Sequence, residues 1–114
     1  MGRYLREQGI EPDLILCSSA KRARQTLKRL GLPDARIEPG LYGADAATLR
    51  RFIPDAASVM LIGHNPGIHD LAVSLARSGP RVPELAAKFP TGALATIELD
   101  TGELIDFVRP RDLA

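Results

Sequence analysis

The sequence predicts a three-layer α/β fold, in which helices cover both faces of a mainly parallel central sheet and a C-terminal β-hairpin follows. Two strongly apolar segments, 13–17 and 58–62, each lead through a polar loop into a stretch with helical periodicity. Short apolar runs without polar alternation are typical of parallel strands that are covered on both faces. Two further apolar segments flank the turn-forming residues 100–103, which indicates the hairpin.

The elements can be assigned in chain order from apolar periodicity and from the residues that stop helices. A helix opens the chain and ends near Gly9, and Gly31 and Pro54 end the next two helices. Residues 80–92, rich in proline and glycine, are expected to form a loop. The remaining expected elements are a strand at 13–17, a helix at 20–30, an edge strand at 36–39, a helix capped by Asp45, a strand at 58–62, a helix at 68–77 and strands at 93–99 and 104–109.

The composition indicates one soluble domain and excludes several classes of protein. With 114 residues and a formal net charge of +1, the chain has room for one core and no overall attraction for nucleic acid. A single cysteine excludes an internal disulfide framework and a cysteine zinc site, and it suits the reducing cytoplasm. The apolar runs are far shorter than the about 20 residues of a membrane-spanning helix. Residues 1–114 are therefore expected to form a single cytoplasmic domain without a metal, cofactor, membrane or nucleic-acid partner, in an oligomeric state that the sequence leaves open.

The loop after the first predicted strand places cations at the start of a helix. Ser18 and Ser19 are both candidate N-caps, and with Ser19 in that role Lys21 and Arg22 occupy the second and third helical positions. Cations there oppose the positive end of the helix dipole unless an anion binds among them. The alternatives are a solvated basic face and, less favoured because no aromatic residue lies nearby, an RNA-binding surface over 21–29.

The loop after the second strand, 63–67, holds a histidine beside another helix start. With Asn65 as N-cap, Pro66 takes the first helical position, where its missing N–H costs nothing. His64 then lies at the carboxyl end of the strand, where it can hydrogen-bond an anion or give it a proton. The alternative is a histidine that only completes the turn. His69 lies off the apolar stripe of the following helix and is expected to face solvent.

These two loops are expected to meet, since ligands in such folds bind where the carboxyl ends of parallel strands share one edge of the sheet. Arg22 and His64 would then face one space that favours phosphate or another oxyanion. This pair of residues predicts an oxyanion pocket but does not specify which reaction takes place there. Cys17 ends an apolar strand and is expected to be a buried, unreactive thiol. The scattered aspartates are expected to cap helices or to solubilise the surface: Asp45, Asp55 and Asp70.

The two loops with their strands, 13–26 and 60–67, resemble the histidine phosphatase superfamily, and in particular its small SixA-type phosphohistidine phosphatases. Residues 89–99 are similar to the closing strands of that branch, so the likeness extends from about residue 1 to residue 109. The resemblance implies a phosphoglycerate-mutase-like fold and a phosphate pocket built from two histidines and two arginines. It implies no metal and no cofactor.

The resemblance also implies roles for individual residues. Arg22 matches the second pocket arginine, which would clamp equatorial oxygens of the phosphoryl group and stabilise charge in the transition state. His64 matches the second pocket histidine, which would hydrogen-bond that group. Either Ser18 or Ser19 would shape the phosphate-binding loop, with neither preferred. The SixA-type branch does not rely on an acidic proton donor, so Asp45 is not assigned as one.

One part of the family pattern is absent from this chain. The family's nucleophile is a histidine in an Arg-His-Gly motif that ends its first strand, whereas no arginine precedes His64 or His69. We therefore expect the chain to lack the central first strand, about 35–45 residues judged from the size of a strand–helix unit. The resemblance implies a hydrolase of protein phosphohistidine or small phosphomonoesters that works through a phosphohistidine intermediate. The alternative is a catalytically inert module that binds phosphate or a phosphoprotein.

Overall fold

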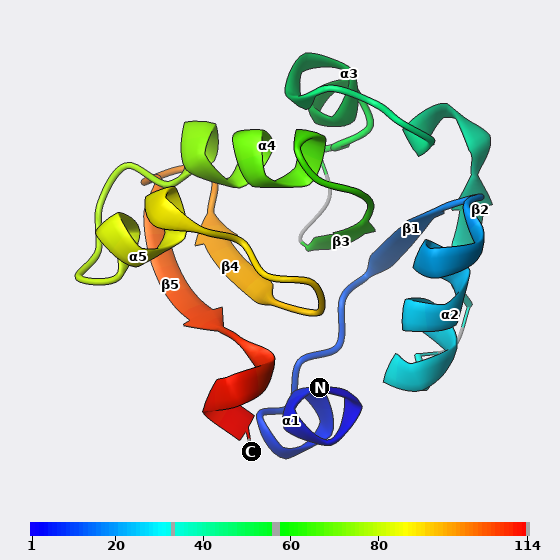
Figure 1. Cartoon of the computed structure of the whole chain (residues 1–114), viewed down its shortest axis with the longest axis horizontal. Coiled ribbons are helices and arrows are strands. Elements are labelled where there is room, and N and C mark those ends of the chain that lie inside the picture. Colours follow the sequence, from blue (N-terminus) through cyan, green and yellow to red (C-terminus); the bar gives the residue numbers. More distant parts are fainter. Residues whose placement is uncertain (33, 56–57, 114) are drawn as a thin grey trace.

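The structure is a computed structural model that describes residues 1–32, 34–55 and 58–113. Its centre is a parallel sheet with the strand order β2-β1-β3 (Figure 1). The strands are β1 (Leu14–Ser18), β2 (Arg36–Glu38) and β3 (Val59–Ile62). Leu16, in the middle strand, is paired with Arg36 on one side and with Leu61 on the other. The predicted strands at 13–17 and 58–62 and the predicted edge strand are therefore confirmed, but only β1 is buried as expected, because most of β3 is half-buried.

Helices cover both faces of this sheet, because the side chains of β1 alternate between two apolar clusters. Ile15 and Cys17 pack with α1 (Gly2–Glu7) and α2 (Lys21–Leu30). Leu16 packs on the opposite face with α3 (Ala46–Arg51) and α4 (Gly67–Leu75). Figure 1 shows α1 and α2 on one side of the sheet and α3 and α4 on the other, so the predicted three-layer arrangement is confirmed.

The predicted hairpin is also present, as a separate two-stranded sheet. β4 (Leu94–Glu98) and β5 (Glu103–Val108) are antiparallel, and the turn between them contains Gly102 at a φ of +73°. A positive φ of this size favours glycine at that position. The inner face of the hairpin packs against α4 and α5 (Val82–Ala87) in a third apolar cluster. Its buried members are Ala72 in α4, Ala76 directly after α4, Leu85 in α5, and Leu104 and Phe107 in β5.

Within the described residues, the parallel sheet and the hairpin are not hydrogen-bonded into one sheet. The strand partner of β3 is β1, and the strand partner of β4 is β5. Met60 and Leu61 of β3, and Leu94 and Ile97 of β4, are only half-buried, whereas 15–18 in β1 are fully buried. Figure 1 shows the hairpin on the β3 side of the parallel sheet. β3 and β4 are therefore apolar edge strands.

Two expectations for the segment before the hairpin were wrong. Residues 80–92 are not entirely a loop, because α5 lies within them and buries Leu85 completely. Its proline lies in the first turn, where the missing N–H is tolerated. The helix expected at 68–77 ends at Leu75, and the N–H of Arg77 instead donates to the carbonyl of Gly102 at 2.7 Å. This bond ties the segment after α4 to the turn of the hairpin.

Short 3-10 helices follow two of the strands. η1 (Pro39–Leu41) follows β2, and η2 (Pro110–Leu113) follows β5. The hydroxyl of Tyr4 donates to the carboxylate of Asp106, which joins α1 to β5. This hydrogen bond raises the pKa of Tyr4 to about 12. In the described part of the chain, no helix has both the length and the apolar character needed to cross a membrane.

Candidate functional site

The loops after the three parallel strands surround one open hollow of about 340 Å³ at the carboxyl edge of the sheet. The segment after β1 lines it with a lysine and an arginine, the segment after β2 with a tyrosine, and the segment after β3 with a histidine. The described residues that line it are Ala20, Lys21, Arg22, Tyr42, Gly43 and His64. Because this set contains two cations and no carboxylate, the hollow favours an anion.

His64 is held in the hollow by a serine from the neighbouring strand. Nε2 of His64 lies 2.8 Å from the hydroxyl oxygen of Ser18, the last residue of β1, which is fully buried. The same oxygen accepts a hydrogen bond from the N–H of Ala20 at 3.2 Å. Ser18 therefore connects the imidazole to the loop that begins α2. Ser19 is half-exposed and is not among the described residues that line the hollow.

The N-terminus of α2 opens onto the hollow without a side-chain cap. Its N-cap is Ala20, not Ser18 or Ser19, the two candidates, and the hydroxyl of Ser18 accepts the N–H of Ala20 itself. Lys21 and Arg22 are consequently the first and second helical residues, one position earlier than predicted. α2 has ten residues and no acidic residue in its first turn, so the positive end of its dipole is not offset there by the chain itself. An anion in the hollow would meet free N–H groups and the Arg22 guanidinium together.

Tyr42 was not singled out by the sequence analysis, yet its ring forms a wall of the hollow. The ring centroid lies 5.9 Å from that of His64, with the two planes tilted by 55°. The side chain is 66% exposed, although the neighbouring Leu41 is buried. The sequence offered one signal for Tyr42: it is an aromatic residue in the segment after β2. Because β2 is parallel to β1, its carboxyl end lies at the same edge of the sheet as the carboxyl ends of β1 and β3.

The N-terminus of α4 differs from the prediction but supports the position of His64. The N-cap is Pro66, and the side chain of Asn65, expected as the cap, instead donates to the carbonyl of Phe89 at 2.8 Å. The carbonyl of His64 accepts the N–H of Ile68 at 2.8 Å. The turn that carries His64 is therefore tied to the first turn of α4 and to the segment before the hairpin.

Gly67 permits α4 to lie close to the loop that carries Tyr42. A Cβ added at Gly67 would lie 2.0 Å from the carbonyl oxygen of Ala44, which no side chain can occupy without a shift of the backbone. Ala44 is itself joined to Leu41 by a backbone hydrogen bond of 3.2 Å. This close approach holds the aromatic wall and the histidine turn at a fixed separation.

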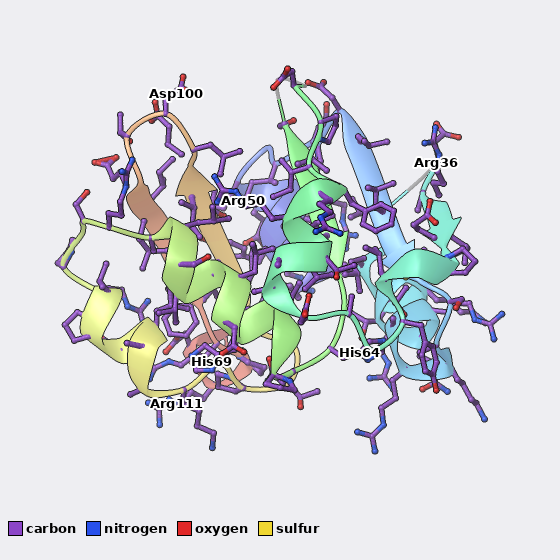
Figure 2. The ribbon with its side chains drawn as sticks, turned by 90° about the horizontal axis from the view of Figure 1, so that it is seen from above. Arg36, Arg50, His64, His69, Asp100 and Arg111 are labelled. Carbon is purple, nitrogen blue, oxygen red and sulfur yellow. The ribbon has the colours of Figure 1, made fainter. Side chains whose placement is uncertain are left out.

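The remaining candidates lie outside the hollow. His69 does not face solvent as expected: it is half-buried, its Nε2 lies 2.6 Å from the carbonyl of Leu85, and its ring stacks on Phe89. The expectation failed because His69 contacts Leu85 of α5, a helix that the sequence analysis did not predict. Figure 2 shows His69 well apart from His64 along the same edge of the molecule.

Cys17 is buried as expected, and burial raises the pKa of its thiol. Asp45 caps α3 through the N–H of Thr48 at 2.9 Å, also as expected.

Comparison with solved structures assigns the fold to a family. The chain superimposes with a TM-score of 0.81 on a crystal structure assigned as the phosphohistidine phosphatase SixA from Agrobacterium tumefaciens, at 30% identity, covering 96% of this chain and 75% of that chain. The chain belongs to the SixA-type histidine phosphatases. A second structure assigned to SixA, from Nakamurella multipartitia, superimposes on this SixA-type chain with a TM-score of 0.71 at 30% identity. That match covers 82% of this chain and 63% of the other.

Relatives of the SixA-type chain also occur in mycobacteria. An uncharacterised protein of Mycobacterium leprae is 31% identical over an alignment of 127 residues. The alignment covers 96% of this chain and 79% of that protein. An uncharacterised protein of Mycobacterium tuberculosis is 35% identical over 107 residues, with coverages of 86% and 68%. No model of a known protein family matches the sequence. The SixA-type chain thus spans between 63% and 79% of the length of these four proteins.

Proposed function

We propose that this chain forms the phosphate-binding part of a phosphatase that acts on protein phosphohistidine or on small phosphomonoesters. The observation that carries the proposal is that Arg22 and His64 line one anion-favouring hollow in a SixA-type fold. The SixA neighbours are assigned as phosphohistidine phosphatases, which supports this substrate class. The substrate would be a phosphorylated protein or a small phosphoester in the cytoplasm.

In this proposal each residue of the hollow has a distinct role. The guanidinium of Arg22 donates two N–H groups to equatorial oxygens of the phosphoryl group, and the free N–H groups of α2 bind the same oxygens. His64 hydrogen-bonds the phosphoryl group as charge redistributes in the transition state. Ser18 keeps the imidazole in place through its 2.8 Å contact with Nε2. None of these steps calls on a metal or a cofactor.

The nucleophile would come from outside the 114 residues. His64 and His69 are the two histidines of the chain, and His69 is engaged with the carbonyl of Leu85. A strand added between the apolar edges of β3 and β4 would satisfy their backbone groups and would end near the hollow. A histidine at its end would attack phosphorus, forming a P–N bond as the bond to the leaving group breaks. Water would then cleave the phosphohistidine and release orthophosphate.

The test is phosphate release from a phosphohistidine peptide by the chain extended with the residues that its reading frame encodes ahead of Met1. We expect turnover, and a loss of about 100-fold or more in Arg22→Ala and in His64→Ala, the scale for removing one transition-state donor. Arg24→Ala is the matched control, since Arg24 is exposed on α2 and does not line the hollow in the described part of the chain. Turnover that survives Arg22→Ala or His64→Ala would contradict the proposed mechanism.

A second candidate function is supported by the contacts of the two histidines, each of which is hydrogen-bonded within the chain. Because His64 contacts Ser18 and His69 contacts Leu85, the 114 residues alone could serve as an inert module that binds phosphate or a phosphoprotein. This function predicts that the 114-residue chain binds inorganic phosphate in calorimetry without turnover. It also predicts that the extended protein is inactive and that Arg22→Ala abolishes binding. Activity of the extended protein would exclude it.

A further inference from the structure

Tyr42 is an aromatic residue left in solvent in a protein with few aromatic residues. The chain has two tyrosines, three phenylalanines and no tryptophan. At 66%, Tyr42 is the most exposed of the large hydrophobic side chains in the described part of the chain. Tyr4, by comparison, is bound to Asp106, and Phe107 is fully buried. An exposed ring at the mouth of an anion-favouring hollow therefore calls for a functional explanation.

The exposure of Tyr42 does not come from a loosely held loop. The N–H of Tyr42 donates to the carbonyl of Pro39 at 3.0 Å, and the N–H of Ala44 donates to the carbonyl of Leu41 at 3.2 Å. Leu41 is only 1% exposed and anchors the segment in the core beneath α3 and α4. Gly67 approaches Ala44 from the other side. The ring is thus held beside His64 before any ligand arrives, which reduces the ordering cost of binding.

The hollow combines two kinds of chemistry on adjacent walls. Lys21 and Arg22 supply positive charge on the side of α2, and Tyr42 supplies an aromatic surface next to His64. If Arg22 and His64 bind the phosphoryl group, the part of the substrate that is bonded to phosphorus would lie next to the ring of Tyr42. An alkyl group offers that ring little contact, whereas a planar ring offers an aromatic pair.

We propose that Tyr42 determines specificity by packing against a planar ring bonded directly to the phosphoryl group, so that the site selects phosphorylated imidazole or aryl groups over alkyl phosphates. This inference rests on the proposed function, because it takes Arg22 and His64 as the phosphoryl-binding groups. The tilt of 55° between Tyr42 and His64 means that the two rings are not stacked face to face, so the tyrosine ring is not fully covered by the histidine.

Binding by the 114-residue chain tests the inference without requiring turnover. The probes are inorganic phosphate, methylphosphonate and phenylphosphonate, measured by isothermal titration calorimetry. Phenylphosphonate is expected to bind about 3- to 10-fold more tightly than methylphosphonate, the range that one aromatic pair contributes. Tyr42→Ala should remove this preference, so that the two phosphonates bind with equal affinity, whereas Tyr42→Phe should retain the preference.

The outcomes separate failure of the inference from failure of the proposed function. If no probe binds, or if binding survives Arg22→Ala, the phosphoryl-binding role of the hollow is wrong and the inference is overturned with it. If all three probes bind and depend on Arg22, but Tyr42→Ala keeps the preference for phenylphosphonate, the inference alone is overturned. It is also overturned if Tyr42→Ala weakens all three probes equally. Chemical shifts of amides outside the hollow, compared between variants, establish that each variant is folded.

Discussion

The hydroxyl oxygen of Ser18 lies 2.8 Å from Nε2 of His64, which joins the last residue of β1 to the loop after β3. The contact crosses the parallel pairing of these two strands, whose register brings Cys17 opposite Ile62. Since Ser18 is fully buried and also accepts the N–H of Ala20, one oxygen sets both the histidine and the start of α2. The geometry of the hollow therefore depends on a side chain that does not line it.

Ser18→Ala is expected to weaken phosphate binding and to lower the free energy of unfolding by about 1–3 kcal/mol, because Nε2 of His64 loses its partner. Calorimetry with inorganic phosphate and urea denaturation measure the two effects. Ser19→Ala is the matched control, since Ser19 is the half-exposed neighbour, and it should change neither quantity. Equal effects of the two substitutions would contradict the role of Ser18.

Gly67→Ala is expected to lower the free energy of unfolding by about 1–3 kcal/mol through overpacking. The added Cβ would lie 2.0 Å from the carbonyl oxygen of Ala44, so α4 or the loop that carries Tyr42 must move. Gly63→Ala is the control, because its Cβ would have its nearest contact at 3.4 Å from a side-chain carbon of Ile68. That substitution should be neutral or stabilising by up to about 1 kcal/mol. Similar losses in urea denaturation for both variants would show that the close approach at Ala44 is not the cause.

Asp112 is expected to titrate with a pKa of about 2, below its ordinary value of 3.8, chiefly because the side chain of Arg109 donates hydrogen bonds to it. A lowered folded-state pKa contributes stability above pH 3.8, and that stability is lost as the pH falls toward 2. Asp112→Asn should therefore be less stable than the wild type at neutral pH, with a difference that shrinks in acid. Carboxyl chemical shifts give the pKa directly. In Arg109→Ala the value should return toward 3.8, and an unchanged value would exclude Arg109 as the cause.

Tyr4 is expected to ionise near pH 12, not near 10, because its hydroxyl donates to Asp106 and the neutral form is favoured. A raised folded-state pKa contributes stability that is complete below pH 10 and is lost as the pH rises toward 12. Ultraviolet absorbance of the Tyr42→Phe variant isolates Tyr4, since the chain has two tyrosines. Adding Asp106→Asn should lower the midpoint. A midpoint that does not respond would mean that Asp106 does not hold this hydroxyl.

Local patterns in the sequence were sufficient to predict the sheet, the layers and most helix ends. The apolar run at 13–17 predicted β1, and Gly31 was expected to end α2, where it lies in the left-handed conformation that stops a helix. α5 was missed because Pro83 and its neighbours were taken as a loop signal, whereas burial of Leu85 against the hairpin stabilises the helix. Propensity alone does not report such a tertiary contact.

The candidate site was predictable only as far as the order of strands allowed. The carboxyl ends of β1 and β3 were expected to share an edge, and the structure places Arg22 and His64 in one hollow. The roles of these two residues stay predictions. The position of Tyr42 at the hollow depends on the parallel pairing of β2 with β1; the sequence predicted an edge strand at 36–39 but not which strand it pairs with. The choice of Ser18 over Ser19 likewise depends on which hydroxyl faces the adjacent strand.

α4 packs into two apolar clusters, with Leu71 against the parallel sheet and Ala72 against the hairpin. Its first turn is bonded to the carbonyl of His64, and the segment after it is bonded to the hairpin turn at Gly102. The helix therefore contacts both sheets, and we expect it to couple them into one cooperative unit. An anion bound beside His64 should slow amide hydrogen exchange in β4 and β5 as well as in β1. Hydrogen exchange in the hairpin would then report anion binding, although the described residues that line the hollow include none from β4 or β5.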